Sequence, residues 1–169
     1  MLHRFNILNK IYTDPKSLAN ELNKQKSSGK TISLTNGCFD LIHRGHLEYL
    51  RKAAEFGHIF VVILNSDESV HKLKGQYRPI QNQNDRAFTL ACIQFIDYVL
   101  ISGPEPRLNQ ELLDIPIDIY VKGGGYKLKS LDIGERKILE SKGCRFEFVD
   151  LIKGYSTSEL IKKILMTDD

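Results

Sequence analysis

Two histidines three residues apart, His43 and His46, are the side chains of this sequence best suited to chemistry on a phosphate. They end the stretch Thr-Asn-Gly-Cys-Phe-Asp-Leu-Ile-His-Arg-Gly-His, residues 35–46. At the start of a helix, side chains three apart can point the same way. Two imidazoles so placed can donate hydrogen bonds to phosphoryl oxygens whose charge grows in a transition state. The spacing also suits a metal pair or a solvated helix face, although the His-Glu-x-x-His order of a zinc protease is absent.

A strand and a helix are predicted on either side of the histidines. Residues 31–34 are a short β-prone run after a Gly-Lys break, which predicts a buried strand. Downstream, Leu47, Leu50 and Ala53 recur at helical spacing until Gly57 ends the segment. In a strand–turn–helix unit, the unpaired N–H groups of the helix start face a phosphate. The pattern therefore favours phosphate binding at this turn.

Strands and helices alternate along the rest of the chain. The predicted strands are 31–34, 59–64, 98–101, 117–121 and 145–149. The predicted helices are 84–94 (capped by Asn84), 106–113, 133–141 and 156–165. An amphipathic helix over 14–28 precedes them and is expected at the sheet edge. This order predicts an α/β chain with a Rossmann-like, doubly wound parallel sheet of about five strands, in a single domain with an N-terminal helix.

Four polar or glycine-rich segments each follow a predicted strand. They are residues 36–46, 65–67 and 122–125, and the segment that leads to Ser156. In a doubly wound sheet, ligands bind beyond the carboxyl ends of the strands, where the strand order reverses. We therefore expect the four segments to converge on one edge of the sheet.

Two other phosphate-binding motifs are excluded. A dinucleotide dehydrogenase carries Gly-x-Gly-x-x-Gly in its first turn, whereas this turn reads Asn-Gly-Cys-Phe-Asp. The Gly-Lys-Thr at residues 29–31 is not a P-loop, because Lys24 stands in place of the first glycine and the run precedes the strand.

Composition narrows the class of protein further. The chain of 169 residues is 41% hydrophobic and 27% charged, which is typical of a globular domain. It has no apolar run of the roughly 20 residues that a membrane helix needs and no signal-peptide pattern, so we expect a cytoplasmic protein. Cys38, Cys92 and Cys144 are too scattered for a disulfide framework or a zinc site. The net charge of +3 is spread along the chain, which favours an anionic small molecule over nucleic acid.

The chain resembles a known family. His-Arg-Gly-His at 43–46 is similar to the signature of the HIGH-type nucleotidyltransferases, and Thr-Asn-Gly-Cys-Phe-Asp resembles in particular the adenylyltransferase domain that makes ADP-heptose. The likeness runs from about Lys30 to Lys163. It also includes residues 62–67, 73–75, 78–80, 121–124 and 155–158.

The resemblance implies transfer of AMP from ATP to a sugar 1-phosphate, D-glycero-β-D-manno-heptose 1-phosphate, with release of pyrophosphate. It implies Mg²⁺ bound with ATP, without a dedicated protein metal site, and a homodimer with neither nucleic acid nor membrane as a partner. It also implies an N-terminal extension over 1–29 and a nucleotidyltransferase domain over 30–169.

The resemblance assigns roles to individual residues. His43, His46 and Lys72 are expected to be catalytic, with Lys72 neutralising the departing pyrophosphate from a flexible loop. Lys74 and Arg86 are expected to hold the acceptor phosphate. The expected nucleotide-binding residues are Asn36, Gly37, Cys38, Phe39, Asp40, Gly45, Asn65, Asp67, Lys122, Gly123, Gly124, Tyr126, Tyr155, Ser156, Thr157 and Ser158.

Several of these residues also have a purely structural explanation. Gly37 and Gly45 suit any tight turn, and Cys38 suits a small buried position. Asn36 and Asp40 could hold their loop through side-chain to backbone hydrogen bonds.

The same holds for residues at predicted helix starts. Residues 65–67 could simply cap a helix, and Ser156 could form a capping box with Glu159. Arg86 could be a solvated helix arginine, and Phe39 a core residue.

The family pattern is not fully met. Gly125 stands where the heptose branch usually has Asp, which leaves base selection and loop geometry open. Alternatives are therefore a glycerol-3-phosphate cytidylyltransferase, an FAD synthetase, or a nucleotide-binding module without turnover.

Overall fold

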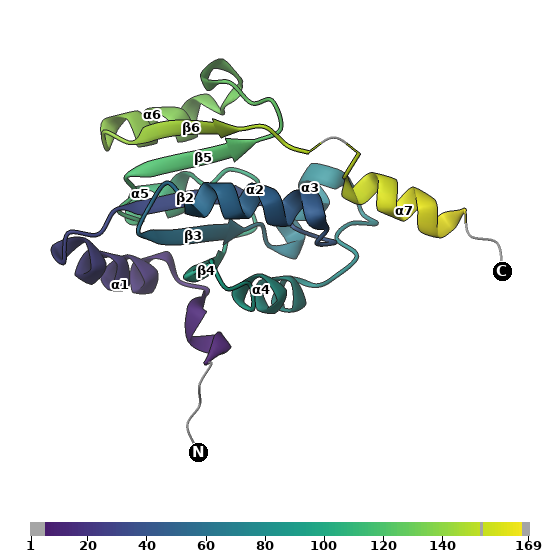
Figure 1. Cartoon of the computed structure of the whole chain (residues 1–169), viewed down its shortest axis with the longest axis horizontal. Coiled ribbons are helices and arrows are strands. Elements are labelled where there is room, and N and C mark those ends of the chain that lie inside the picture. Colours follow the sequence, from purple (N-terminus) through teal and green to yellow (C-terminus); the bar gives the residue numbers. More distant parts are fainter. Residues whose placement is uncertain (1–5, 153, 167–169) are drawn as a thin grey trace.

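Within residues 6–152 and 154–166, which the computed structural model describes, six parallel strands form one sheet (Figure 1). Their order is β1-β4-β3-β2-β5-β6. The strands are β1 (Ile11–Tyr12), β2 (Ile32–Gly37), β3 (Ile59–Leu64), β4 (Tyr98–Ile101), β5 (Ile119–Gly123) and β6 (Arg145–Val149). The α-helices are α1 (Pro15–Ser27), α2 (Arg44–Ala54), α3 (Asp67–Lys74), α4 (Gln83–Ala91), α5 (Asn109–Asp114), α6 (Ile133–Ser141) and α7 (Thr157–Leu165). Two 3₁₀ turns are η1 (Ile7–Lys10) and η2 (Leu128–Ser130).

The predicted α/β class, Rossmann-like parallel sheet and single domain are confirmed. The sheet has six strands instead of about five, because the two-residue strand β1 pairs with β4. So short a strand has no alternating pattern that a sequence could reveal. The division into 1–29 and 30–169 stays a prediction, and residues 1–5, 153 and 167–169 of those ranges lie outside the described part.

Helices cover both faces of the sheet. On one face, α1, α5 and α6 pack through Leu18, Leu112 and Leu139, which are fully buried. On the other face, α2 and α4 pack through Leu50 and Leu90. All residues of β3 are buried between the two layers, which explains its uninterrupted apolar sequence.

The chain changes direction across the sheet between β2 and β5. From β2 it runs through β3 to β4, and it then returns to β5 and β6 on the other side of β2. The loops that follow β2 and β5 consequently lie side by side at the carboxyl edge, the place where such sheets bind ligands.

Several helix boundaries differ from the prediction, among them the starts of α4 and α5. α4 is capped by Asn82, not Asn84, because Asn82 Oδ1 accepts the N–H groups of Asn84 and Asp85. α5 begins at Asn109 instead of residue 106, with Leu108 as its N-cap residue and no side-chain cap. At α4, therefore, a side-chain acceptor satisfies N–H groups at the helix start.

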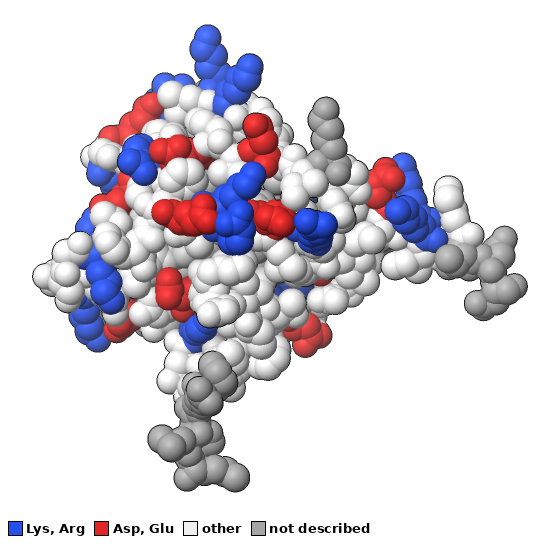
Figure 2. Space-filling view, in the orientation of Figure 1, with Lys and Arg blue, Asp and Glu red and all other residues white. Residues whose placement is uncertain are grey.

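The outer face of α2 carries alternating charges. Arg44 pairs with Glu48 at 3.7 Å, and Arg51 pairs with Glu48 at 3.5 Å and with Glu55. Positive and negative side chains therefore lie next to each other across the middle of Figure 2. Because these charges are paired with each other, the outer face of α2, whose residues are all described, offers no unpaired cluster of one sign.

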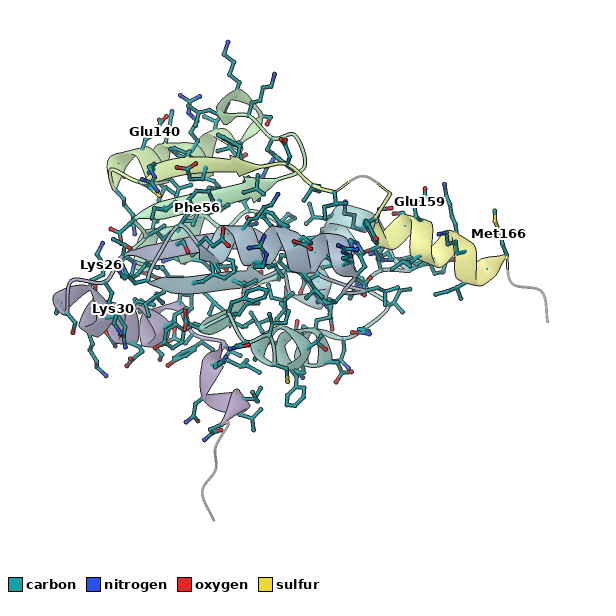
Figure 3. All side chains as sticks on the ribbon, in the orientation of Figure 1. Lys26, Lys30, Phe56, Glu140, Glu159 and Met166 are labelled. Atoms are coloured by element: carbon teal, nitrogen blue, oxygen red, sulfur yellow. The ribbon has the colours of Figure 1, made fainter. Side chains whose placement is uncertain are left out.

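α7 extends away from both layers (Figure 1). None of its residues is fully buried, and Glu159 on the helix and Met166 just after it are exposed (Figure 3). Its first residue nevertheless contacts the loop before α2, because Thr157 Oγ1 donates to the Leu41 carbonyl at 3.4 Å. No helix within residues 6–152 and 154–166 is long and apolar enough to span a membrane.

Candidate active site

A cavity of about 530 Å³ opens at the carboxyl edge of the sheet. It is lined by the loops after β2 and β5 and by the first residues of α6 and α7, with contributions from α3 and the loop after β4. Of the predicted site residues, it brings together Asn36, Gly37, Cys38, Phe39, Asp40, His46, Asn65, Lys74, Lys122, Gly123, Tyr126, Thr157 and Ser158. Its lining does not include His43, Gly45, Asp67, Lys72, Arg86, Gly124, Tyr155 or Ser156.

The two histidines form a stacked pair at the start of α2. Their ring centroids are 3.8 Å apart with an interplanar angle of 15°. His43 caps the helix, because its Nδ1 accepts the N–H of His46 at 3.3 Å. A neutral His43 must then carry its proton on Nε2. His46 lies on the cavity side and His43 packs behind it, with the ring of Tyr155 6.2 Å from His43.

Each histidine has one buried nitrogen that lacks a hydrogen-bond partner within residues 6–152 and 154–166. These atoms are His43 Nε2 and His46 Nδ1. Buried polar atoms are rarely left unpaired in proteins, and those that are need an explanation such as a bound ligand. The Leu41 backbone nevertheless interacts with His46 and raises its pKa, and of the two rings only that of His46 lines the cavity where a ligand could bind.

Both rings are held neutral. Burial and then the neighbouring His43 lower the pKa of His46 to about 4. Burial also lowers the pKa of His43. At neutral pH each imidazole therefore carries a single N–H, and His46 can donate to a phosphate oxygen when its proton is on the nitrogen that faces the cavity.

The buried side chain of Asp40 holds the loop that contains residues 78–81. Its side chain is 1% exposed and accepts the N–H groups of Ile80 and Gln81 and the Nε of Arg78, at 2.6–3.0 Å. Burial raises its pKa, but the N–H groups of Gln81 and Ile80 and the guanidinium of Arg78 outweigh burial and hold the pKa below its usual value. Because both oxygens are occupied, Asp40 serves to hold the loop that carries Arg78.

Arg78 was missed as a site residue. It lines the cavity, and its bond to Asp40 uses Nε, so the two terminal nitrogens remain available to a ligand. The sequence offered a signal, since Arg-Pro-Ile at 78–80 belongs to the family likeness. No local pattern, however, distinguishes it from the other arginines.

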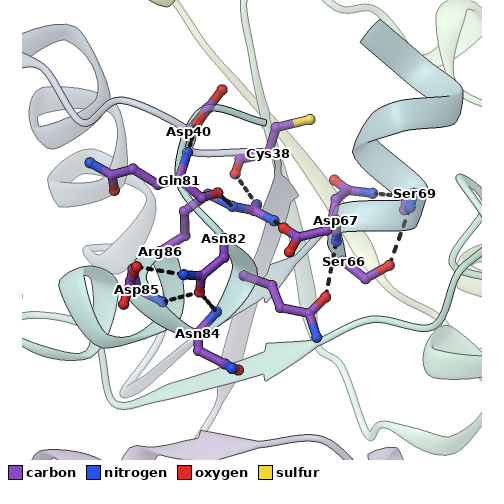
Figure 4. Close-up of polar contacts among 12 residues, drawn as sticks. Cys38, Asp40, Ser66, Asp67, Ser69, Gln81, Asn82, Asn84, Asp85 and Arg86 are labelled. Atoms are coloured by element: carbon purple, nitrogen blue, oxygen red, sulfur yellow. Dashed lines mark hydrogen bonds and ion pairs between the residues drawn. The ribbon is translucent and has the colours of Figure 1, made fainter. Parts of the chain in front are cut away.

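The role of Arg86 as a phosphate clamp stays a prediction, and in this structure Arg86 does not line the cavity. Arg86 is fully buried, and its Nε, Nη1 and Nη2 donate to Gln81 O, Cys38 O and Asp67 Oδ1 at 3.0, 2.6 and 2.7 Å (Figure 4). It joins α4 to the loops after β2 and β3. Arg86 is therefore a positioning residue, and Asp67, which pairs with it, is held away from the cavity.

Of Lys72 and Lys74, both expected near the phosphates, only Lys74 lines the cavity. Both lie in the last turn of α3 and not on a loop. Lys72 pairs with Glu68 at 3.1 Å and Glu105 at 2.9 Å and does not line the cavity. Lys74, two residues further round the helix, lines it. The catalytic role predicted for Lys72 stays a prediction, and in this structure its ammonium pairs with two exposed glutamates away from the cavity.

A buried polar cluster lies beneath the cavity. Asn36 is in β2, and its Oδ1 accepts from Lys122 Nζ and from Tyr120 Oη at 2.8 Å, so it does not bond to loop backbone as predicted. The Lys122 ammonium also lies 5.4 Å from the Tyr126 ring centre. Burial lowers the pKa of Lys122. This lysine is a preoriented donor at the end of β5.

Two glycines allow close packing beside the site. A Cβ on Gly123 would lie 2.7 Å from the Tyr49 ring, and one on Gly45 would lie 2.7 Å from the Tyr155 Cβ. Gly45 thus serves packing of the histidine helix. Gly125, where the family has Asp, has φ +75°, a conformation that suits glycine.

The starts of α3 and α7 are capped as predicted. Ser66 Oγ accepts the N–H of Ser69, and Ser156 Oγ accepts the N–H of Glu159 at 3.1 Å. Ser156 is thereby occupied, whereas Thr157 and Ser158 line the cavity. Asn65 also lines it, with its amide donating to the Ser69 hydroxyl.

Phe39 and Cys38 lie at the boundary between core and cavity. Phe39 is 6% exposed, with its ring 5.4 Å from that of His46, and its φ of +43° turns the chain sharply after β2. Cys38 is half-buried, and burial raises the pKa of its thiol. Both residues line the cavity.

Sequence reasoning also missed the side of the cavity formed by the loop after β4 and the start of α6. Its members include Arg107, Ser130, Asp132 and Glu135. None belongs to a segment that the family likeness singled out. Within the described ranges, no group of three or more His, Cys, Asp or Glu side chains could hold a metal ion.

Comparison with known proteins assigns the chain to a family. Residues 34–163 match the profile described as cytidylyltransferase-like, which covers most of the chain. The chain belongs to the cytidylyltransferase-like family. This confirms the likeness to HIGH-type nucleotidyltransferases that the sequence around His43 and His46 indicated.

Relatives of this cytidylyltransferase-like chain include bifunctional proteins named HldE. That of Citrifermentans bemidjiense is 43% identical over 148 residues, which are 88% of this chain and 30% of the relative. That of Helicobacter pylori is 42% identical over 161 residues, 95% of this chain and 33% of the relative. The chain thus spans about a third of these relatives.

A solved structure supports the fold. The lipopolysaccharide core biosynthesis protein of Thermoplasma volcanium superposes with a TM-score of 0.59 at 24% identity, over 76% of this chain and 100% of that protein.

Proposed function

We propose that this chain transfers AMP from ATP to a sugar 1-phosphate, D-glycero-β-D-manno-heptose 1-phosphate, and thereby makes ADP-heptose. The observation that carries the proposal is the stacked, neutral pair His43 and His46 at a helix start, with His46 lining the cavity. Membership of the cytidylyltransferase-like family supports nucleotidyl transfer. The choice of sugar rests on the likeness of residues 35–40 to the heptose branch.

The reaction needs little covalent help from the protein. An oxygen of the sugar 1-phosphate attacks the α-phosphorus of ATP, the bond from that phosphorus to the bridging oxygen breaks, and pyrophosphate leaves. A phosphate monoester is already largely dianionic near pH 7, so no base has to remove a proton. The protein must instead align two anions and stabilise charge on the transferring group.

The residues at the cavity can meet that demand. His46, supported by His43, would donate to the transferring phosphate from the start of α2, where the helix dipole also favours anions. Lys74 and Arg78 are cations on the same cavity and would receive phosphate oxygens. The N–H groups and hydroxyls of Thr157 and Ser158 offer a second cradle.

Mg²⁺ belongs to this proposal as part of the substrate. It accompanies ATP, keeps most of its ligands as water and phosphate oxygens, and shields phosphate charge when bound. The described side chains, which offer no cluster of three ligands, fit a metal that is held mainly by ATP. A homodimer and a cytoplasmic location stay predictions from the sequence.

A pyrophosphate-release assay tests the proposal. The chain is expected to release pyrophosphate with MgATP and heptose 1-phosphate, and His46→Ala is expected to lower turnover by about 10² or more while retaining the fold. Release only with CTP and glycerol 3-phosphate, or only with ATP and flavin mononucleotide, would move the chain to another branch. Nucleotide binding without release across all acceptors would make it a binding module.

A further inference from the structure

The cavity has two chemically different sides. On the side of α2 and α3 its charged groups are cationic, namely Lys74 and Arg78, since the Asp40 carboxylate is occupied by the loop. On the side of α5 and α6 it is bordered by the carboxylates of Asp132 and Glu135. A phosphate is attracted to the first side, whereas on the second side the charge of Arg107 is balanced by Asp132 and Glu135 adds a negative charge. The carboxylate side therefore fits an uncharged, hydrogen-bonding part of a substrate.

Of the two carboxylates, only Glu135 is free to bind a ligand. Asp132 Oδ1 caps α6 by accepting the N–H groups of Gly134 and Glu135, and Asp132 Oδ2 pairs with Arg107 at 2.7 Å. Glu135 receives a single hydrogen bond from the described residues, from the Leu108 N–H to Oε1 at 3.0 Å. Its side chain lines the cavity although the residue is only 7% exposed, so its second oxygen is an available acceptor.

Two donors line the same cavity as this acceptor. Lys122, at the end of β5, lines the same cavity. The charge of Glu135 raises the pKa of Lys122, although burial lowers that pKa by more. Ser130 adds a hydroxyl to the lining. A sugar hydroxyl both donates and accepts, and it is matched by a carboxylate next to an ammonium and a hydroxyl.

We propose that Glu135 accepts a hydrogen bond from a ring hydroxyl of the sugar acceptor and so selects a polyhydroxylated substrate. This inference rests on the function proposed above. A hydroxyl that donates to an ionised carboxylate forms a short, charge-assisted bond. The ribose of ATP offers the same chemistry with fewer hydroxyls. The acceptor is favoured because a triphosphate would bind at the cationic side of the cavity, and a heptose has more hydroxyls than ribose.

Glu135→Gln tests this assignment. Glutamine keeps an oxygen for the Leu108 N–H but replaces the charged acceptor with a neutral one. We expect the KM for heptose 1-phosphate to rise about tenfold, as for the loss of a charge-assisted bond, with the KM for ATP unchanged within about twofold. Calorimetric titration of ATP in the absence of sugar should give the wild-type affinity.

Glu111→Gln is the matched control. Glu111 is 6% exposed and likewise accepts one backbone N–H, that of Gly103 at 2.9 Å, but it does not line the cavity. Both variants should melt at similar temperatures, and only Glu135→Gln should change the KM for sugar.

The other outcomes overturn the inference. A raised KM for ATP with an unchanged KM for sugar would place the ribose against Glu135. Equal effects of the two variants on the KM values would reduce Glu135 to a structural role. Deoxy analogues of the sugar phosphate add a direct check, since the one that lacks the recognised hydroxyl should bind wild type and Glu135→Gln alike. If wild type releases no pyrophosphate with any sugar 1-phosphate, the proposed function fails first, and that result is distinct from an unchanged variant of an active enzyme.

Discussion

Replacing Arg86 tests whether this arginine supports the fold or binds the acceptor. Its guanidinium is fully buried and donates to Gln81 O, Cys38 O and Asp67 Oδ1. Arg86→Ala removes all of these bonds at once. It leaves Asp67 unpaired and a cavity where the side chain lay.

The magnitude follows from those bonds. Hydrogen bonds to charged groups contribute about 1.5–3 kcal/mol each but do not add fully, and breaking a buried ion pair costs about 3–5 kcal/mol. The Asp67 side chain is 34% exposed, so its share is screened by solvent. We therefore expect Arg86→Ala to lower the free energy of unfolding by about 3–4 kcal/mol. With a urea m-value of about 2 kcal/mol/M, the midpoint would fall by roughly 1.5–2 M.

Urea unfolding followed by circular dichroism measures this effect. Arg86→Lys, which keeps the charge but cannot reach three acceptors, should fall between wild type and Arg86→Ala. Arg136→Ala is the control, because Arg136 is a surface helix residue paired with Glu140 at 2.7 Å, and its loss should cost under about 1 kcal/mol. If Arg86→Ala unfolds like wild type and only raises the KM for the phosphorylated acceptor, Arg86 is a clamp and the positioning role is refuted.

Three further results are expected. The imidazole of His46 binds a proton below pH 6.5 in the unfolded chain but only near pH 4 in the folded chain, so the free energy of unfolding should fall by at most about 3 kcal/mol as pH drops from 6.5 toward 4. The urea midpoint should fall less over this pH range in His46→Gln than in wild type. An equal fall in both would contradict the lowered pKa. Lys74→Ala should lower kcat/KM for pyrophosphate release about tenfold or more, whereas Lys72→Ala should stay within about twofold; the reverse result would restore the sequence-based assignment. Gly123→Ala should destabilise the chain by about 1–3 kcal/mol in thermal unfolding, since its methyl would lie 2.7 Å from the Tyr49 ring, and an unchanged melting temperature would show that the ring can move.

The sequence determined features that depend on neighbours along the chain. Strand β3 is apolar throughout because both of its faces are buried, and the caps Ser66 and Ser156 follow from a hydroxyl three residues before a helical N–H. His43 and His46 could be placed at a helix start for the same reason, since their spacing and the following apolar pattern are both local.

Tertiary structure alone decided which polar side chains face the cavity. Lys72 and Lys74 are two residues apart on α3, and the packing of the helix turns one toward the cavity and the other toward Glu105. Arg86 is buried because its acceptor Cys38 O comes from a loop 48 residues away. Glu135 reaches the cavity only because α6 packs beside β5, and no periodicity in one segment encodes such a contact between distant segments.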